Sequence, residues 1–432
     1  MKRTAWVSVF LCAMTSVKMT SARATDTRAQ NAPLTFDQAL SRLMEVSTSL
    51  QVQQTQLDSA DIRQTQARFQ FTPSVSLAAK TGKSGTSLYR GEQTSNQAVA
   101  SSDLNLFRFG ADWADLAAAG KDLEAQQALY ENETLNAELQ SVSFLVDEIS
   151  KRINAEVDRE FVKLREQSLL IAKERFSQGL LAQQEVEKVK VDLENSRARL
   201  ADAEASQAEA DAALMARIGT SSVDSSWPWK AELLERKSRV FKLGEKPSDL
   251  HPGLRAAALV VEAQESKLSS KRRLFWPSLD ANFTYGFYDG VTQTGLPAQK
   301  AWSGALTLSF PLFNRYANAS DIGLQAQSVI AAEKKRDGVR IDLDQEKRSS
   351  QAGFELALES VKRRVDTLQI SKRIYQDNLR RFRGGRITAD ELLIDQDRLL
   401  TSQLLEVEGW ATVHRQSTRY CHALGYRLRD CL

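Results

Sequence analysis

The chain has 432 residues, of which 42% are hydrophobic, 26% are charged and only 7% are aromatic, with 8 prolines. A composition poor in aromatic residues and proline, and rich in alanine, glutamine, glutamate, lysine and leucine, is typical of long helices and argues against a series of compact domains. The 58 basic residues nearly balance the 55 acidic ones, so the net charge of +3 gives no reason to expect nucleic acid as a partner.

Residues 1–24 are predicted to be a secretory signal peptide. Lys2 and Arg3 precede an apolar stretch over residues 5–17, and Ala22-Arg23-Ala24 offers a cleavage site before Thr25. The apolar stretch is too short for a membrane-spanning helix, which needs about 20 apolar residues. A chain with this signal peptide is predicted to be exported. The segment holds four basic and no acidic residues, so its removal changes the net charge from +3 to −1.

Residues 25–219 are predicted to form a first structural repeat. Its patterns indicate a helix, a β-hairpin and a long helical hairpin, at about residues 34–70, 73–107 and 111–219. The first rod of the helical hairpin, residues 111–175, contains no proline and would span roughly 100 Å at about 1.5 Å per residue. Its apolar residues step by four and three, which is the spacing of a coiled-coil seam: Leu135, Leu139, Val142, Val146, Ile149 and Ile153.

Residues 220–249 interrupt the helical pattern and are predicted to be a linker between repeats. Residues 250–432 are predicted to form the second structural repeat. Its parts are a helix, a β-hairpin at about 276–313, a helical hairpin at about 317–425 and a short C-terminal tail. In this β-hairpin, apolar residues alternate with small or polar ones, so each strand has one apolar and one polar face.

The two repeats are related by an offset of 206 residues. Arg175-Phe176-x-x-Gly179, followed by Glu185, recurs as Arg381-Phe382-x-x-Gly385, followed by Glu391. Two copies are too few for a solenoid, which needs at least three repeats to bury a core. The chain is therefore one unit built twice, and we expect it to be part of a larger assembly.

The strands of both β-hairpins are long enough to cross a bilayer as tilted strands of about 10 residues. Four strands cannot close a barrel, and open edges in lipid leave backbone groups unsatisfied. We therefore expect several copies to share one barrel, and threefold symmetry gives twelve strands. Aromatic residues near the strand ends are predicted to form a membrane belt in contact with lipid: Phe275, Trp276, Tyr288, Trp302, Phe310 and Phe313.

Several short motifs follow one another along the mature chain. They are Leu34-Thr35-Phe36-Asp37-Gln38-Ala39-Leu40, Phe71-Thr72-Pro73-Ser74, Arg175-Phe176-Ser177-Gln178-Gly179-Leu180, His251-Pro252-Gly253-Leu254, Trp276-Pro277-Ser278-Leu279 and Phe310-Pro311-Leu312-Phe313. In their order, spacing and duplication these motifs resemble the TolC family of outer-membrane efflux ducts. The resemblance covers essentially the whole mature chain.

The resemblance implies a mainly helical homotrimer that contains a membrane β-barrel portion. A twelve-stranded β-barrel in the outer membrane would continue into a long α-helical coiled-coil barrel in the periplasm. The implied function is the exit duct of a tripartite efflux or type I secretion system. The implied partners are a periplasmic adaptor (membrane fusion) protein and an inner-membrane ABC, RND or MFS transporter, and the duct itself is not an enzyme. A non-channel periplasmic coiled-coil scaffold is the alternative.

The resemblance also places the two hairpin tips, residues 175–186 and 381–392, deepest in the periplasm, where they meet the adaptor and close the pore. The family's gate arginine is replaced by Ile387, with Arg386 one position earlier. Two interpretations stay open: an arginine–carboxylate bond between neighbouring tips that holds the gate shut, or solvated charges of Arg381, Arg383 and Arg386 that are favoured at the end of a helix by its dipole. The predicted tip, gate and adaptor-contact residues are Arg175, Phe176, Gly179, Leu180, Glu185, Arg381, Phe382, Gly385, Arg386 and Glu391.

The remaining candidate residues indicate no catalytic site, cofactor or metal. His251, His414 and His422 with the two cysteines Cys421 and Cys431 fit no zinc-ligand spacing. The two cysteines either form a disulfide, which an exported compartment permits, or remain two thiols. The basic run at residues 271–273 is expected to mark the periplasmic edge of the membrane.

Overall fold

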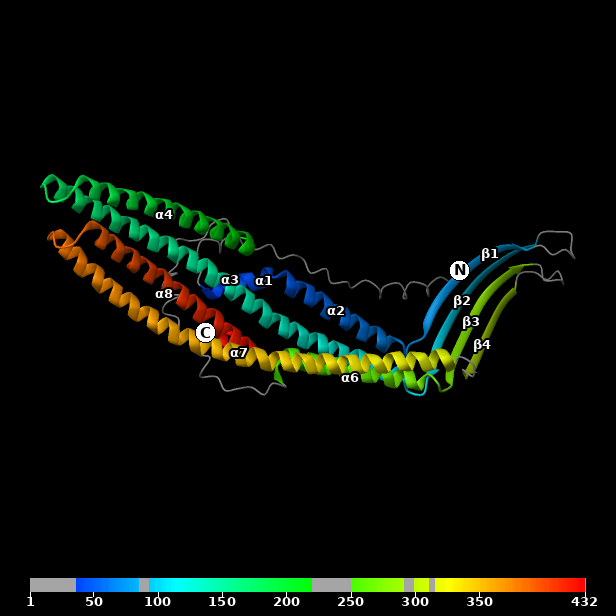
Figure 1. Ribbon diagram of the computed structural model, residues 1–432. Helices are drawn as coiled ribbons and strands as arrows, with labels where there is room; N and C mark the ends of the chain where they lie inside the picture. Colours follow the sequence, from blue (N-terminus) through cyan, green and yellow to red (C-terminus); the bar gives the residue numbers. More distant parts are fainter. Residues whose placement is uncertain (1–35, 85–92, 220–249, 291–298, 311–314, 432) are drawn as a thin grey trace.

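The computed structural model describes residues 36–84, 93–219, 250–290, 299–310 and 315–431. The predicted signal peptide and linker lie outside these residues, as does Phe313. The described chain is an elongated rod of helices with a β-sheet at one end and two helical tips at the other (Figure 1).

The first repeat begins with two helices where the sequence pattern indicated one. The backbone leaves helical geometry at Ser47, where φ is −58° and ψ is 111°, and the Ser47 hydroxyl lies 3.1 Å from that of Ser49. Local hydrogen bonds of serine compete with the helix. The elements are α1 (Phe36–Val46), α2 (Thr48–Phe69), β1 (Ser74–Ser84), β2 (Gln93–Phe107), α3 (Ala111–Ser177) and α4 (Gln183–Ile218).

The second repeat has the same order of helix, two strands and a long helical hairpin. Its elements are α6 (Pro252–Arg273), β3 (Ser278–Gly290), β4 (Gln299–Ser309), α7 (Arg315–Arg383), α8 (Ala389–Ala423) and the short α9 (Leu428–Cys431). The predicted duplicated unit is confirmed as two sets of elements that lie side by side.

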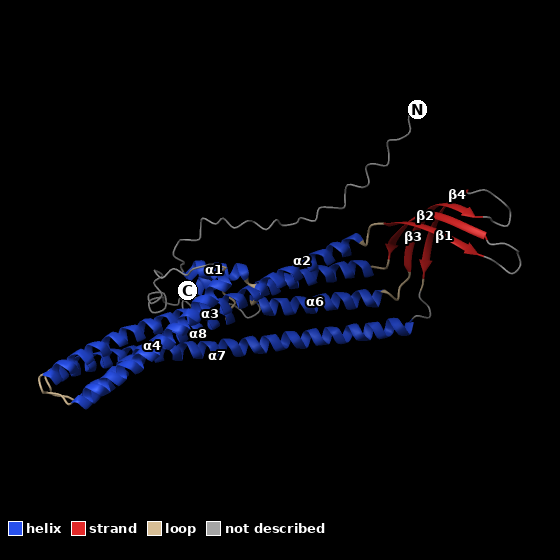
Figure 2. Ribbon diagram, turned by 90° about the horizontal axis from the view of Figure 1, so that it is seen from above, coloured by secondary structure: helices blue, strands red, loops and turns tan. Residues whose placement is uncertain are grey.

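The two longest helices set the length of the rod. Helix α3 has 67 residues and α7 has 69, and each runs from the sheet to a tip. Helices α2 and α4 pack along successive parts of α3, and α6 and α8 do the same along α7 (Figure 2). Among the described residues, no helix is both long enough and apolar enough to cross a membrane.

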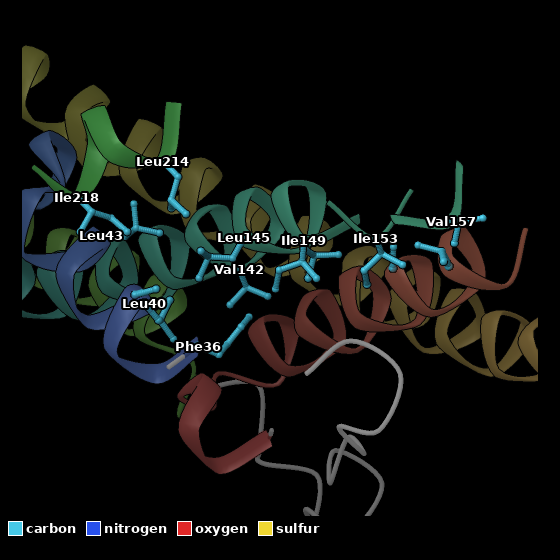
Figure 3. Close-up of a cluster of buried hydrophobic side chains, with 14 of the residues drawn as sticks. Phe36, Leu40, Leu43, Val142, Leu145, Ile149, Ile153, Val157, Leu214 and Ile218 are labelled. Atoms are coloured by element: carbon cyan, nitrogen blue, oxygen red, sulfur yellow. The ribbon is translucent and has the colours of Figure 1, made fainter. Parts of the chain in front are cut away.

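The main hydrophobic core lies at the middle of the rod, where α1, α4 and α8 meet α3 (Figure 3). The seam predicted in α3 contributes Val142, Val146, Ile149 and Ile153, each at most 2% exposed. Phe36, Leu40 and Leu43 of α1 cover this seam from one side. The spacing of four and three places these side chains on one stripe of the helix, and packing this stripe is what holds the helices together.

The sheet has the order β1-β2-β3-β4 in the described residues, and every pairing is antiparallel. Paired residues share a face, so polar and apolar rows cross all four strands. One row joins Ser76, Ser101, Thr284 and Ser303, with hydroxyl contacts of 2.7 Å between the first two and 2.6 Å between the last two. The opposite face is apolar and exposed in one chain: Leu77 is 82% exposed and Trp302 is 73% exposed.

Candidate functional site at the helical tips

The two tips have the same backbone geometry. Gly179 and Gly385 both have a φ of 73°, a left-handed conformation that glycine adopts without a steric penalty. In the first tip, the amides of Gly179 and Leu180 donate to the carbonyls of Phe176 and Arg175. The second tip repeats these bonds with Gly385 and Arg386 as donors and with Phe382 and Arg381 as acceptors. Both long helices therefore end in a Schellman motif that reverses the chain.

Arg175 joins the two tips. Its side chain is buried, with Nη1 donating to the carbonyl of Phe382 at 3.1 Å and Nη2 donating to the carbonyl of Leu180 at 3.4 Å. Its guanidinium carbon also lies 5.0 Å from the centre of the Phe382 ring, within the range of a cation–π contact. Since Arg175 lies in the last turn of α3 and Phe382 in the last turn of α7, this one side chain bonds the first tip to the second.

Phe382 is 0% exposed and lies in the hydrophobic core of the tips. The resemblance assigned this residue to the gate, and that role stays a prediction, because within one chain the ring faces the core. The buried partners come from α3, α4, α7 and α8: Ala172, Val189, Tyr375, Ala389, Leu392, Leu393 and Leu399.

Most other predicted tip residues lie on the surface. Phe176 is 45% exposed and Leu180 is 63% exposed, while Arg381, Arg386 and Glu391 are also exposed. Within the described part of the chain, no carboxylate lies at ion-pair distance from Arg386. A bond from it to a carboxylate of a neighbouring tip therefore stays a prediction.

Glu185 and Glu391 occupy equivalent positions in the first turn of α4 and α8. A carboxylate there is favoured by the positive end of the helix dipole. The second helix is also capped, because the Thr388 hydroxyl accepts from the Glu391 amide at 3.3 Å. The N-cap residue of the first is Ala182, whose side chain cannot cap the helix.

An open groove of about 730 Å³ runs between the starts of α4 and α8. The Lys188 ammonium bridges it, 2.7 Å from a carboxylate oxygen of Asp390. Burial raises the pKa of Asp192 in this groove above its usual value, Arg165 opposes the shift, and the nearby carboxylates of Asp397 and Asp390 reinforce it. The lining residues are Gln183, Gln184, Glu187, Lys188, Val191, Asp192 and Asp390.

A buried polar network behind this groove was not predicted from the sequence. Arg165 of α3 donates to the side chains of Gln396 at 2.8 Å and Asp397 at 2.6 Å, and Gln396 donates to Ser168 at 2.8 Å. Burial lowers the pKa of the Arg165 guanidinium, and the charge of Asp397 opposes this shift. The signal was present, because continuing the seam of α3 by steps of four and three reaches buried positions that are not apolar. These steps run through Val157, Phe161, Arg165, Ser168, Ala172 and Arg175.

Aromatic residues gather where the helices meet the sheet. Of the predicted belt, Phe275, Trp276 and Phe310 lie at this junction; Trp276 and Phe310 are at least 48% exposed and Phe275 is half-buried. Trp302 is also exposed, but it pairs with Tyr285 toward the other end of β4. The side chain of Tyr288 lies outside the described ones. The first repeat adds aromatic residues that were not predicted: Phe107 and Phe109 lie 4.9 Å apart between ring centres, and Phe71 lies 4.9 Å from Trp113.

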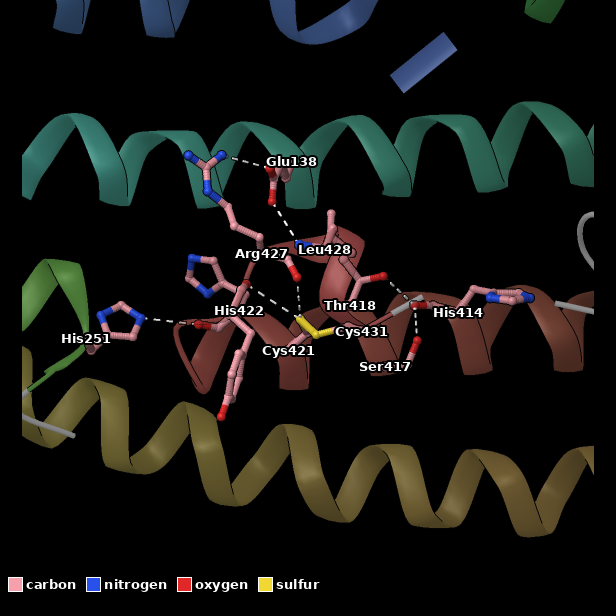
Figure 4. Close-up of a disulfide and its surroundings, with 11 residues drawn as sticks. Glu138, His251, His414, Ser417, Thr418, Cys421, His422, Arg427, Leu428 and Cys431 are labelled. Carbon is pink, nitrogen blue, oxygen red and sulfur yellow. Dashed lines mark hydrogen bonds and ion pairs between the residues drawn. A yellow bond between two sulfur atoms is a disulfide. The ribbon is translucent and has the colours of Figure 1, made fainter. Parts of the chain in front are cut away.

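The cysteines and two of the histidines have structural partners at the middle of the rod (Figure 4). Cys421 and Cys431 form a disulfide, which answers the alternative left open by the sequence. The carboxylate of Glu138 accepts from Arg427 at 2.9 Å and from the Leu428 amide at 3.0 Å, fixing α9 on α3. His422 bonds Asn136, and His251 caps α6 through the amide of Gly253.

No group of three or more histidine, cysteine or acidic side chains among the described residues is placed to hold a metal ion. The arrangement of the rod instead offers two exposed tips, a groove beside them and a two-faced sheet at the far end.

Comparison with known proteins identifies the kind of molecule that this arrangement forms. The chain matches the family described as "Outer membrane efflux protein" over residues 39–220 and 248–425. Comparison of the sequence with curated proteins gave no match.

Solved structures of three outer-membrane proteins have the same fold. The CmeC outer membrane channel of Campylobacter jejuni is 16% identical with a TM-score of 0.73, over 92% of this chain and 89% of that one. The MtrE outer membrane channel of Neisseria gonorrhoeae is 17% identical with a TM-score of 0.73, over 90% and 88%. VceC of Vibrio cholerae is 19% identical with a TM-score of 0.69, over 90% and 96%. The predicted resemblance and outer-membrane location are confirmed, and the chain belongs to the outer membrane efflux protein family.

Proposed function

We propose that three copies of this chain form the exit duct of a tripartite export system. An inner-membrane transporter of the ABC, RND or MFS class supplies the cargo, and a periplasmic adaptor connects it to the tips. The observation that carries the proposal is the sheet, in which β1 and β4 each pair on one side only within the described residues.

The free edges argue for a barrel shared between copies. The strands have 11 to 15 residues, which is enough to cross a bilayer when tilted. In lipid, each unpaired backbone group on β1 or β4 costs several kcal/mol, so an isolated four-stranded sheet is unstable there. Pairing β4 of one copy with β1 of the next satisfies both edges, and three copies give twelve strands.

The two faces of the sheet support a water-filled barrel. The apolar face, with Leu77, Phe283, Tyr285 and Trp302 all at least 50% exposed in one chain, suits lipid. The hydroxyl row at Ser76, Ser101, Thr284 and Ser303 suits a watery lumen. A periplasmic scaffold without a channel has no use for such a sheet, and the family is one of transport channels rather than enzymes.

The tips are proposed as the gate and the adaptor contact. Exposed arginines at the end of α7, together with Glu185 and Glu391 beside the turns, provide charges that neighbouring copies can pair. Charge-assisted hydrogen bonds contribute about 1.5–3 kcal/mol each. A small number of such bonds between copies is therefore enough to bias the pore toward its closed state.

The test is the conductance of single channels of the purified protein in planar lipid bilayers, with the oligomer mass measured in the same detergent. We expect a trimer with discrete conductance that increases in Arg386→Ser and Glu185→Ala. Arg363→Ser is the matched control, because Arg363 is 79% exposed on α7 away from the tip. A trimer with unchanged conductance in both tip variants removes the gate and keeps the duct. A monomer that does not insert contradicts the duct itself.

A further inference from the structure

A small pocket lies at the junction between the helices and the sheet. It has a volume of about 330 Å³. It is formed by the end of α6, the start of β3, the end of β4 and the residue that follows β2. Its lining residues are Arg108, Arg273, Leu274, Trp276, Ser278, Ser309 and Phe310. It is separate from the tips, which are at the other end of the rod (Figure 1).

Two guanidinium groups give the pocket its charge. Arg108 is 46% exposed, and its Nη1 lies 3.7 Å from a carboxylate oxygen of Asp112. Arg273 donates from Nη1 to the carbonyl of Gly110 at 2.7 Å, an interaction with no anion. A guanidinium has five N–H donors, so both arginines keep donors available for a further acceptor.

The aromatic side of the pocket is continuous with the apolar face of the sheet. Phe310 follows Leu308 by two residues, and Leu308 pairs with Leu279 on that face. The Trp276 ring stacks on Phe109 at 5.6 Å, and Phe109 packs on Phe107 at the end of β2. A side chain that is apolar at one end and polar at the other, as tryptophan is, favours the boundary between lipid tails and headgroups.

We propose that this pocket binds the phosphate of an anionic glycerophospholipid in the periplasmic leaflet of the outer membrane. Guanidinium groups bind phosphate oxygens through paired, charge-assisted hydrogen bonds. Ser278 and Ser309 pair with each other on the polar face of the sheet, and the Ser278 hydroxyl donates to Asp280 at 3.1 Å, so the phosphate is assigned to the two arginines alone. The lipid tails would then lie along Trp276, Phe310 and the apolar face above them. A free phosphate would use the arginines but would gain nothing from these aromatic residues.

The test measures lipid binding to the purified, delipidated full-length protein by native mass spectrometry, with phosphatidylglycerol and phosphatidylcholine of equal chain length as probes. We expect phosphatidylglycerol to bind more tightly, and Arg108→Gln to weaken it about tenfold, which corresponds to about 1.4 kcal/mol. Arg272→Gln is the matched control, because Arg272 is exposed one residue before Arg273 and does not line the pocket. We expect it to change the affinity less than about twofold, since it leaves the direct phosphate contacts in place.

Arg273→Gln also removes the bond to Gly110, so Arg108→Gln is the primary variant and thermal unfolding of both checks that the fold is kept. Three results would each overturn the proposal. An equal loss of phosphatidylglycerol affinity in Arg272→Gln would mean that the lipid is attracted to the positive charge of this region in general and not bound in the pocket. Equally tight binding of glycerol 3-phosphate would mean a free-phosphate site. Dissociation of the oligomer in Arg108→Gln with unchanged lipid binding would mean that a second copy of the chain covers the pocket. None of these readouts depends on transport.

Discussion

The two helical tips have the same sequence motif and the same turn, yet the arginine is the buried residue of the motif in one tip and the phenylalanine is the buried residue in the other. In the first tip Arg175 is 9% exposed and Phe176 is 45% exposed. In the second tip Arg381 is exposed and Phe382 is fully buried. Within one chain, the buried Arg175 of the first repeat lies over the ring of the buried Phe382 of the second repeat. The contact between the tips therefore uses the arginine of the motif from the first repeat and the phenylalanine of the motif from the second.

The comparison separates what duplication preserves from what it leaves free to change. The turn depends on a glycine with positive φ and on backbone bonds, and these are the same in both tips. Burial depends on which helices each one meets, and these differ: α3 packs on α2, α4, α6 and α8, whereas α7 packs on α6 and α8. A repeated motif therefore predicts a repeated backbone more reliably than a repeated role.

The largest expected difference between the tips comes from the phenylalanines. Phe382→Ala should destabilise the protein by about 3–5 kcal/mol, the usual loss for a buried phenylalanine. Phe176→Ala, at the equivalent exposed position, should change stability by less than about 1 kcal/mol. Chemical unfolding followed by circular dichroism measures both. Equal losses would show that Phe176 is buried in the assembled protein and that the asymmetry belongs only to the single chain.

The arginines should show the opposite order. Arg175→Met removes the hydrogen bonds of the guanidinium to the carbonyls of Phe382 and Leu180 and should cost about 1.5–3 kcal/mol, the usual contribution of a hydrogen bond to a charged group. Arg381→Met should fall within about 0.5 kcal/mol of the parent, as expected for an exposed position. The same unfolding experiment compares the pair. A larger effect from Arg381→Met would indicate that its guanidinium has a partner in the assembly.

The glycines should differ less, because the strain of a positive φ is common to both. Alanine in the left-handed conformation costs about 1–2 kcal/mol at either position. At Gly385 an added Cβ would also lie 3.3 Å from Nη2 of Arg175, whereas at Gly179 nothing lies within 4 Å. Gly385→Ala should therefore lower the melting temperature more than Gly179→Ala. In an Arg175→Met background the difference should disappear.

The smallest effect should come from the ion pair between Lys188 and Asp390, which links α4 to α8 on the surface. Its hydrogen bond and charge raise the pKa of Lys188 above the usual 10.5. A raised pKa of a basic group stabilises the fold fully below that usual value, and the contribution is lost as the pH rises through the higher folded value. Lys188→Ala should therefore matter slightly at neutral pH, and not at all in 1 M salt, where screening removes exposed pairs. Stability that is unchanged by salt in the parent and lower in the variant would instead indicate a packing role for the Lys188 stem.

The sequence was sufficient for features that depend on local patterns. The period of two in residues 278–287 predicted the faces of β3, and the glycines at 179 and 385 predicted the turns. The membrane belt was predicted from aromatic residues near the strand ends of the second repeat. A search for aromatic residues near the strand ends of the first repeat would also have found Phe107, Phe109 and Trp113. The break at Ser47 was missed, although Ser47, Thr48 and Ser49 form a short run of hydroxyl residues, because such residues also occur inside helices.

Contacts between distant segments could not be predicted in the same way. Arg165 meets Gln396 across 231 residues of chain, and its position on the α3 seam says only that it faces another helix. Which polar residue of α8 lies opposite depends on the relative shift of two helices, and a displacement by one turn of about 5.4 Å changes every partner. The burial of Arg175 against Phe382 depends on the same shift.

The lengths of α3 and α7 have a mechanical consequence. Of the described helices, only these two extend from the sheet to the tips, while α2, α4, α6 and α8 stop near the middle. Any axial pull or torque applied at the tips must therefore pass the middle of the rod through two continuous backbones. At that level α1 packs on α3, Glu138 of α3 holds α9, and the disulfide joins α9 to α8. These additional contacts stiffen the middle of the rod. We therefore expect bending to be concentrated in the segments on either side, which lack α1 and α9.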